Sequence, residues 1–177
     1  MTTQQLSTQT AAATYAARVD AVLAQRTRLR GPQPPGDLFA ALPPDHILLV
    51  SDPRRELDPA LAAIAAYVEP DDVIVDVGGG AGRLDLPLVL RCRELVNVDP
   101  SAAMGAAFAA TARRADIANA RFVHGAWPVA DPPAGDLVLV NHVTYLTRDI
   151  VPFLTALDAA ARRRVIVTVA SPPSLWW

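Results

Sequence analysis

The stretch VIVDVGGGAGRLDLPLVL, Val73–Leu90, joins a short apolar run to a glycine-rich segment. Four of the five residues from Gly78 to Gly82 are glycine. A β-branched apolar run that stops at such a cluster predicts a strand entering a tight turn, because glycine tolerates backbone conformations that strain other residues. Glycine also lacks a side chain, so a ligand can approach its backbone closely. The stretch therefore predicts a strand, a ligand-binding turn, and a helix that begins near Ala81.

Four further apolar runs follow along the chain, namely ELVNV, RFVH, DLVLV and RVIVTV. Short runs that are apolar on both faces are typical of parallel strands covered by helices. The segments between them carry apolar residues at helical spacing, for example Ile150, Phe153 and Leu157. This alternation predicts an α/β fold, a doubly wound, mostly parallel Rossmann-like sheet with helices on both faces. Such sheets bind ligands at the carboxyl ends of the strands, where the strand order reverses.

The N-terminal part of the chain predicts a separate segment. Its start is polar, and Tyr15 and Val19 then fall on one face of a helix that we expect from about Ala12. A connection rich in proline and glycine, LRGPQPPGDLFAALPPD, follows this helix. We therefore expect residues 1–56 to form the helix and linker, and residues 57–177 to form the α/β domain.

Composition restricts the partners that we expect. The chain has 177 residues and a net charge of -2, which gives no electrostatic reason for a nucleic-acid or membrane partner. A single cysteine, Cys92, excludes an internal disulfide framework and leaves too few thiols for a structural zinc site. All 16 basic residues are arginine, which excludes Schiff-base chemistry on lysine. We expect a cytoplasmic protein without leader or membrane anchor that binds a small molecule and no metal.

The spacing of the glycines favours one class of ligand over another. A dinucleotide fingerprint requires G-x-G-x-x-G, whereas Gly78, Gly80 and Gly82 give G-x-G-x-G, followed by Arg83. This spacing argues against a pyrophosphate at the turn. An NAD- or FAD-dependent oxidoreductase remains an alternative, because such an enzyme would use the same strand and turn. A glycine-rich turn that binds nothing is the other alternative.

An acidic residue ends the second predicted strand. In LVNVDPSAAM, Asp99 lies where a carboxylate can accept hydrogen bonds from both hydroxyls of a ribose. Asp99 could instead cap the following helix, a duty that Ser101 could share. The acid and the glycine turn occur together, which favours a ligand that contains a nucleoside. A non-catalytic nucleoside-binding protein is therefore a further alternative to an enzyme.

Together, VIVDVGGGAGR and VNVDPSAAM resemble the class I S-adenosylmethionine-dependent methyltransferases, particularly the group that acts on small molecules. The resemblance runs from about Pro59 to Ala170. It implies S-adenosyl-L-methionine as cofactor and a small-molecule acceptor as substrate. The cofactor site that it implies comprises the residues of the first and second motifs and one after the fourth strand: Asp76, Gly78, Gly79, Gly80, Gly82, Asp99, Pro100, Ser101, Met104 and Asn141.

This sequence departs from the family pattern after the third strand. The family often has an acidic residue there that accepts from the adenine amino group, but HGAWPVAD places Ala126 and Trp127 at this point. The adenine contact would then come from backbone at Ala126 or from stacking on the Trp127 ring. Packing of Trp127 under a loop is the alternative.

His142 is the candidate catalytic residue. The resemblance places Asn141 and His142 between the cofactor and the acceptor, and histidine as a residue type can serve as a general base near neutral pH. The alternative is that His142 binds the following loop and shapes the pocket floor.

The end of the chain also departs from the family. The resemblance implies seven strands finished by an antiparallel hairpin, but SPPSLWW contains two prolines and cannot supply two further strands. We expect the hairpin to be lacking, either because the chain is truncated or because this is a short variant. The fifth strand would then be an edge, and the apolar Trp176–Trp177 end would favour a homodimer.

Overall fold

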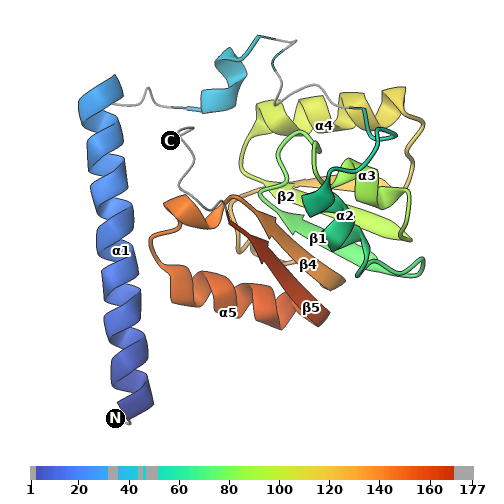
Figure 1. Ribbon diagram of the computed structural model, residues 1–177. Coiled ribbons are helices and arrows are strands. Elements are labelled where there is room, and N and C mark those ends of the chain that lie inside the picture. Colours follow the sequence, from blue (N-terminus) through green and yellow to red (C-terminus); the bar gives the residue numbers. More distant parts are fainter. Residues whose placement is uncertain (1–2, 32–35, 44–45, 47–51, 170–177) are drawn as a thin grey trace.

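The computed structural model describes residues 3–31, 36–43, 46 and 52–169. Its sheet has five strands in the order β3-β2-β1-β4-β5, and all neighbouring strands are parallel (Figure 1). The predicted α/β fold class is therefore confirmed. The strands are β1 (Val73–Val77), β2 (Glu94–Asp99), β3 (Ala120–His124), β4 (Gly135–Asn141) and β5 (Ala161–Thr168). The helices are α1 (Thr3–Arg30), α2 (Pro59–Ala65), α3 (Leu86–Val89), α4 (Ala102–Arg114) and α5 (Ile150–Ala160), with short 3-10 helices η1 (Leu38–Ala41) and η2 (Thr144–Leu146).

Two apolar clusters cover the two faces of the sheet. Ile74 packs with Phe108 of α4 in a cluster that also contains residues of α2 and α3. Its neighbour Val75 points to the opposite face, where it packs with Phe153 and Leu157 of α5. Each fully buried side chain of this size contributes about 1.5–3 kcal/mol of hydrophobic stabilisation. Helices on both faces explain why all five residues of β1 are buried.

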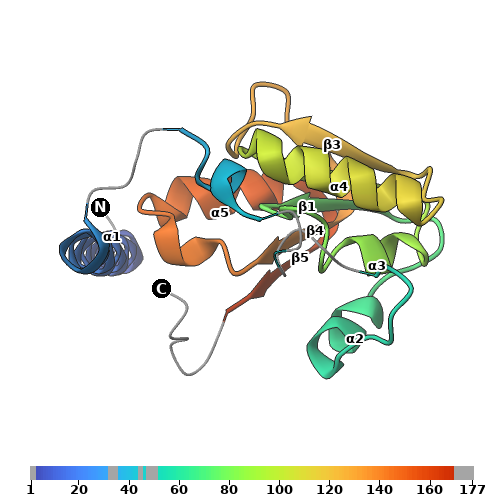
Figure 2. The same cartoon turned by 90° about the horizontal axis from the view of Figure 1, so that it is seen from above.

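Helix α1 lies to one side of the sheet, beside one end of α5 and roughly perpendicular to it (Figure 1), and it is seen end-on in Figure 2. The Tyr15 hydroxyl donates to the Thr144 carbonyl oxygen at 2.5 Å. Asp20 forms an ion pair with Arg148 at 3.1 Å. Val19 is the buried residue of the predicted apolar face, whereas other apolar residues of that face are partly exposed. These contacts attach α1 to the loop after β4.

Two helices begin at other positions than the sequence predicted. Helix α1 begins at Thr3 instead of about Ala12, because the polar residues between them include no glycine or proline that would stop it. Helix α3 begins only at Leu86. Gly82 has a φ of +87°, which is incompatible with a helix, and Pro87 lies in the first helical turn, where proline is tolerated.

Within the described part of the chain, β5 pairs with β4 alone and forms an edge of the sheet. The segment SPPSLWW lies outside the described residues, so the lacking hairpin and the homodimer stay predictions. None of the described helices has the length and hydropathy that crossing a lipid bilayer requires.

Candidate functional site

A row of polar side chains crosses the carboxyl ends of the central strands. Asp76 on β1 is the register partner of Asn97 on β2 and of Leu139 on β4. The Asn141 side chain donates to Asp76 Oδ1 at 3.4 Å, and its own Oδ1 accepts from the Thr168 hydroxyl at 2.8 Å. The order of the strands reverses at β1, so this row lies at the switch point where doubly wound sheets bind ligands.

The glycine turn packs directly on this row. Gly78, Gly80 and Gly82 all have positive φ, which side chains rarely tolerate. A Cβ atom on Gly79 would lie 2.8 Å from Asp76 Oδ2, so the turn fits only without side chains. The four glycines therefore have a structural reason. The amides of Gly78, Gly80 and Gly82 already donate within the chain, to the Val98 carbonyl oxygen, the Asp99 carboxylate and the Gly79 carbonyl oxygen.

Asp99 joins the turn to the next helix. Its Oδ2 accepts from the Gly80 amide at 3.1 Å, and its Oδ1 accepts from the Ser101 amide at 2.8 Å. Burial raises the pKa of the carboxyl group, and these two amides oppose the shift. The N-cap of α4 is Ser101, whose Oγ accepts from the Met104 amide at 3.0 Å. Because Ser101 caps the helix, Asp99 keeps acceptor capacity beside the turn.

Asp37 contributes to the same region and was not predicted from sequence. Its carboxylate accepts from the Ser101 hydroxyl and from the Ala103 amide, both at 2.9 Å. The Ala103 amide is the largest of the effects that lower the pKa of Asp37. The segment expected to be a linker therefore reaches the start of α4, and no local pattern in the sequence indicates it.

Two buried carboxyl groups lie beneath the turn. Burial, opposed by the Asn141 side chain, raises the pKa of Asp76 to about 7. Asp85 is also buried, and its pKa is raised well above the ordinary value by burial and then by the charge of Asp76. Sequence reasoning missed Asp85, because it reads as one polar position in an apolar run.

His142 is the first residue after β4 and is exposed. It has a φ of +60°, an uncommon conformation for a residue with a side chain. Its Nδ1 lies 3.2 Å from the Tyr145 hydroxyl, and the two rings are stacked with centroids 6.1 Å apart. His142 therefore lies at the predicted edge of the sheet, and its ring binds the following loop as the alternative interpretation expected.

The residues predicted near the adenine are only partly brought together. Met104 is buried, with its sulfur 3.6 Å from the position a Cβ on Gly80 would take. Pro100 is exposed, and its carbonyl oxygen lies 2.9 Å from the His124 ring, which links the ends of β2 and β3. Trp127 packs against the cluster on the α5 face, which favours the packing interpretation. Ala126, its neighbour, is exposed.

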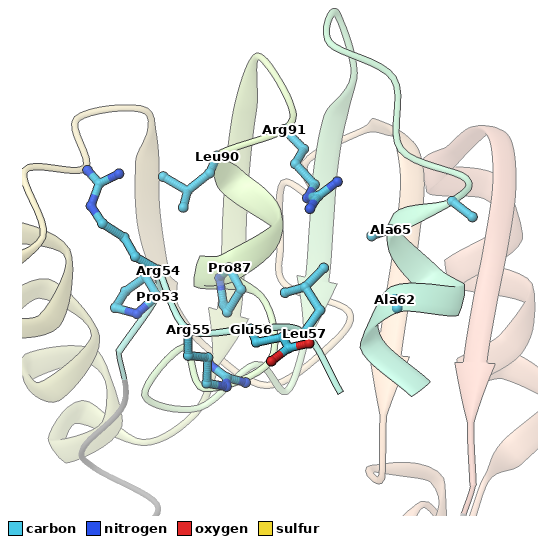
Figure 3. Close-up of a pocket in the computed structure, with 11 residues that line it drawn as sticks. Pro53, Arg54, Arg55, Glu56, Leu57, Ala62, Ala65, Pro87, Leu90 and Arg91 are labelled. Carbon is cyan, nitrogen blue, oxygen red and sulfur yellow. The ribbon is translucent and has the colours of Figure 1, made fainter. Parts of the chain in front are cut away.

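A cavity of about 660 Å³ lies away from this edge of the sheet, between segment 53–57, α2 and α3 (Figure 3). Its described lining includes Arg55, Glu56 and Leu90 but none of the predicted site residues. Arg55 also donates to the Arg83 carbonyl oxygen at 2.7 Å. The cavity thus lies on the side of the glycine turn that faces away from the predicted site residues. The described residues contain no group of three or more His, Cys, Asp or Glu that could hold a metal ion.

No protein-family model matches the chain. Over 85 residues, the chain is 35% identical to the 23S rRNA (uracil(1939)-C(5))-methyltransferase of Aeromonas salmonicida. The match covers 48% of this chain but only 19% of that protein, so the chain spans about a fifth of the curated relative's length.

Solved structures give a broader likeness. The magnesium protoporphyrin IX methyltransferase of Synechocystis, with bound SAM, has a TM-score of 0.57 at 20% identity, over 64% of this chain and 58% of that one. A SAM-dependent methyltransferase of Thiobacillus denitrificans, in complex with S-adenosyl-L-homocysteine, has a TM-score of 0.53 at 17% identity, over 66% and 48%. At such identities the likeness establishes the fold. The described domain has the fold of the class I S-adenosylmethionine-dependent methyltransferases.

Proposed function

We propose that the protein is an S-adenosylmethionine-dependent methyltransferase that methylates a small-molecule acceptor. The observation that carries the proposal is the carboxylate of Asp99 beside the glycine turn, at the point where the order of the strands reverses. A carboxylate there can accept from two ribose hydroxyls. A Cβ atom on Gly80 would meet only the Met104 sulfur, at 3.6 Å, so a ligand can approach the backbone at this glycine. The likeness in fold and the curated relative both support this assignment.

The proposed cofactor residues divide by the part of the ligand that they would hold. Asp76, the glycine turn and Asn141 would surround the methionyl end, and Asp99 the ribose. Pro100, Ser101 and Met104 would line the adenosine pocket, with Ala126 at its rim. S-adenosylmethionine supplies a methyl group that is already electrophilic on a sulfonium, so the protein has to align the acceptor and exclude water.

The cofactor can be tested by thermal stability. A ligand that binds only the folded protein raises the melting temperature. At a ligand concentration of one hundred times the Kd, it adds about 2.7 kcal/mol to the free energy of unfolding. We expect S-adenosylhomocysteine to raise the melting temperature and NAD and FAD to leave it unchanged. The reverse pattern would support the oxidoreductase alternative. Stabilisation without methyl transfer to any acceptor would support a non-catalytic nucleoside-binding protein.

His142 is proposed as the general base for a hydroxyl or amine acceptor. Its exposed ring lies at the end of β4, one residue from Asn141. We expect His142→Asn to lower kcat about 100-fold while S-adenosylhomocysteine binds as before, because general-base catalysis contributes at least about this much. The measurement is the pH profile of methyl transfer from labelled S-adenosylmethionine to a panel of small hydroxyl and amine acceptors. Tyr145→Phe is the control, since it removes the hydroxyl that contacts the ring and keeps the imidazole itself. Equal losses in both variants would assign His142 a structural role.

The chemical class of the acceptor, a small molecule or RNA, is also a proposal. The net charge of -2 led us to expect no nucleic-acid partner, but the curated relative is named as an RNA methyltransferase, so the comparisons do not support that exclusion. We retain a small-molecule acceptor because the net charge offers little attraction for phosphates. The acceptor panel should therefore contain an RNA oligonucleotide beside the small molecules.

A further inference from the structure

Asp85 is the most unusual side chain near the glycine turn. It is 0% exposed, and neither of its carboxylate oxygens has a hydrogen-bond partner within the described structure. The amides of Leu86 and Asp85 lower its pKa, but burial and then the Asp76 charge outweigh them and raise it. A buried carboxylate without a partner costs several kcal/mol, which favours the neutral form of Asp85 in the free protein.

Other buried acceptor atoms near the glycine turn also have no hydrogen-bond partner in the described structure. Asp76 Oδ2 and Asn97 Oδ1 are also buried without a partner. Both side chains lie directly under Gly79. The amide group of Asn97 already donates to the Gly80 carbonyl oxygen at 3.0 Å. Buried acceptors without donors are rare in folded proteins, which indicates that a ligand supplies the missing hydrogens.

The negative charges around Asp76 and Asp85 are also uncompensated. Asp99 on β2 adds a further negative charge that acts on both Asp76 and Asp85. Asp37, the residue before η1, raises the pKa of Asp99, and His124 on β3 lowers it. Asn141 on β4 is the neutral partner of Asp76. In the described part of the chain, no arginine forms an ion pair with Asp76 or Asp85.

We propose that Asp85 and Asp76 share one proton in the free protein, and that the ammonium group of the donor expels this proton when it binds. The inference rests on the proposed function, since the methionyl end of that ligand carries an N–H cation. In the free protein the pair has one proton and one negative charge. In the complex both groups are carboxylates, the ammonium group contacts Asp76, and the proton passes to the buffer. Asp85 is thus a positioning residue that acts through Asp76.

Calorimetry of S-adenosylhomocysteine binding at pH 8 tests the inference. At this pH Asp76, with a pKa of about 7, is mostly ionised, so a released proton reports on Asp85. Titrations in phosphate and in Tris, which differ in ionisation enthalpy, give the number of protons released. We expect binding to release about one proton from the wild type and none from Asp85→Asn. The affinity of the wild type should then rise with pH, by up to about tenfold per pH unit.

Two controls make the result specific. Methylthioadenosine has the nucleoside but no ammonium group, so its binding to the wild type should release no proton. Asp158→Asn changes an exposed carboxylate on α5 and should release as many protons as the wild type. If Asp85→Asn does not fold, the comparison of the two ligands on the wild type decides alone.

The outcomes separate this inference from the proposed function. Binding of S-adenosylhomocysteine without proton release at pH 8 overturns the inference and leaves the proposed function standing. Equal release from the wild type and Asp85→Asn, or equal release with both ligands, overturns it as well. Absence of any binding overturns the proposed function and the inference together.

Discussion

Replacing Asp99 by alanine is expected to weaken S-adenosylhomocysteine binding by about 100-fold or more. A hydrogen bond to a charged group contributes about 1.5–3 kcal/mol, and the carboxylate would accept two from the ribose. Each 1.4 kcal/mol corresponds to about a tenfold change in Kd, so losing two such bonds gives this loss. The variant also loses the contact that joins the Gly80 amide to the start of α4. Calorimetric titration of both proteins at one pH measures the effect.

The matched variants separate a binding defect from a folding defect. Asp99→Asn keeps one acceptor oxygen and should bind with an affinity between those of the wild type and Asp99→Ala. Asp71→Ala removes an exposed carboxylate from the loop before β1 and should bind as the wild type does. A cooperative unfolding transition in every variant shows that each is folded. Unchanged affinity of folded Asp99→Ala would remove Asp99 from the site.

The fold was readable from sequence because its signals are local. The run from Val73 to Val77 is β1 with the predicted bounds, since four of its five residues are β-branched and suit a strand that is buried on both faces. The start of α2 at Pro59 follows an Asp58 side chain that accepts from the Leu61 amide at 2.9 Å. Each of these signals lies within a few residues of the structure that it specifies.

The site was only partly readable, because two of its acids depend on contacts that no local pattern encodes. Asp37 reaches Ser101 across 64 positions of the chain, from a segment whose prolines and glycine predict only a linker. Asp85 lies within an apolar run, where it reads as an exposed helix position. In the structure α3 begins only at Leu86, after the positive φ of Gly82, and Asp85 is the buried residue before this helix.

Tertiary packing also decided between alternatives that the sequence left open. Ser101 and Asp99 were both candidates for the cap of α4, and the structure gives the cap to Ser101. Trp127 could have stacked on a ligand or packed under a loop, and its side chain contacts the cluster on the α5 face. Such choices depend on which residues meet across the sheet, and the sequence does not state this.

The ligand-free protein is expected to lose stability as the pH rises from 5 to 8. The pKa of Asp76 is raised from 3.8 to about 7 by burial, so between these values the folded state binds more protons than the unfolded state. Stability then falls as pH rises through this window, and Asp85 extends the fall to higher pH. Each pKa unit corresponds to about 1.4 kcal/mol, and about two of the pKa units between 3.8 and 7 lie within the range from pH 5 to 8, so Asp76 alone should lower the free energy of unfolding by about 3 kcal/mol over this range.

Urea unfolding at pH 5, 7 and 8 measures this dependence. Asp76→Asn and Asp85→Asn keep the shape of the side chain but cannot ionise, so each should flatten the fall and raise the free energy of unfolding at pH 8. Asp158→Asn, on the surface of α5, should follow the wild type at every pH. A wild-type stability that stays constant or rises between pH 5 and 8 would contradict the prediction. S-adenosylhomocysteine should restore most of the loss at pH 8, because its ammonium group gives the ionised pair the donor that the chain does not supply.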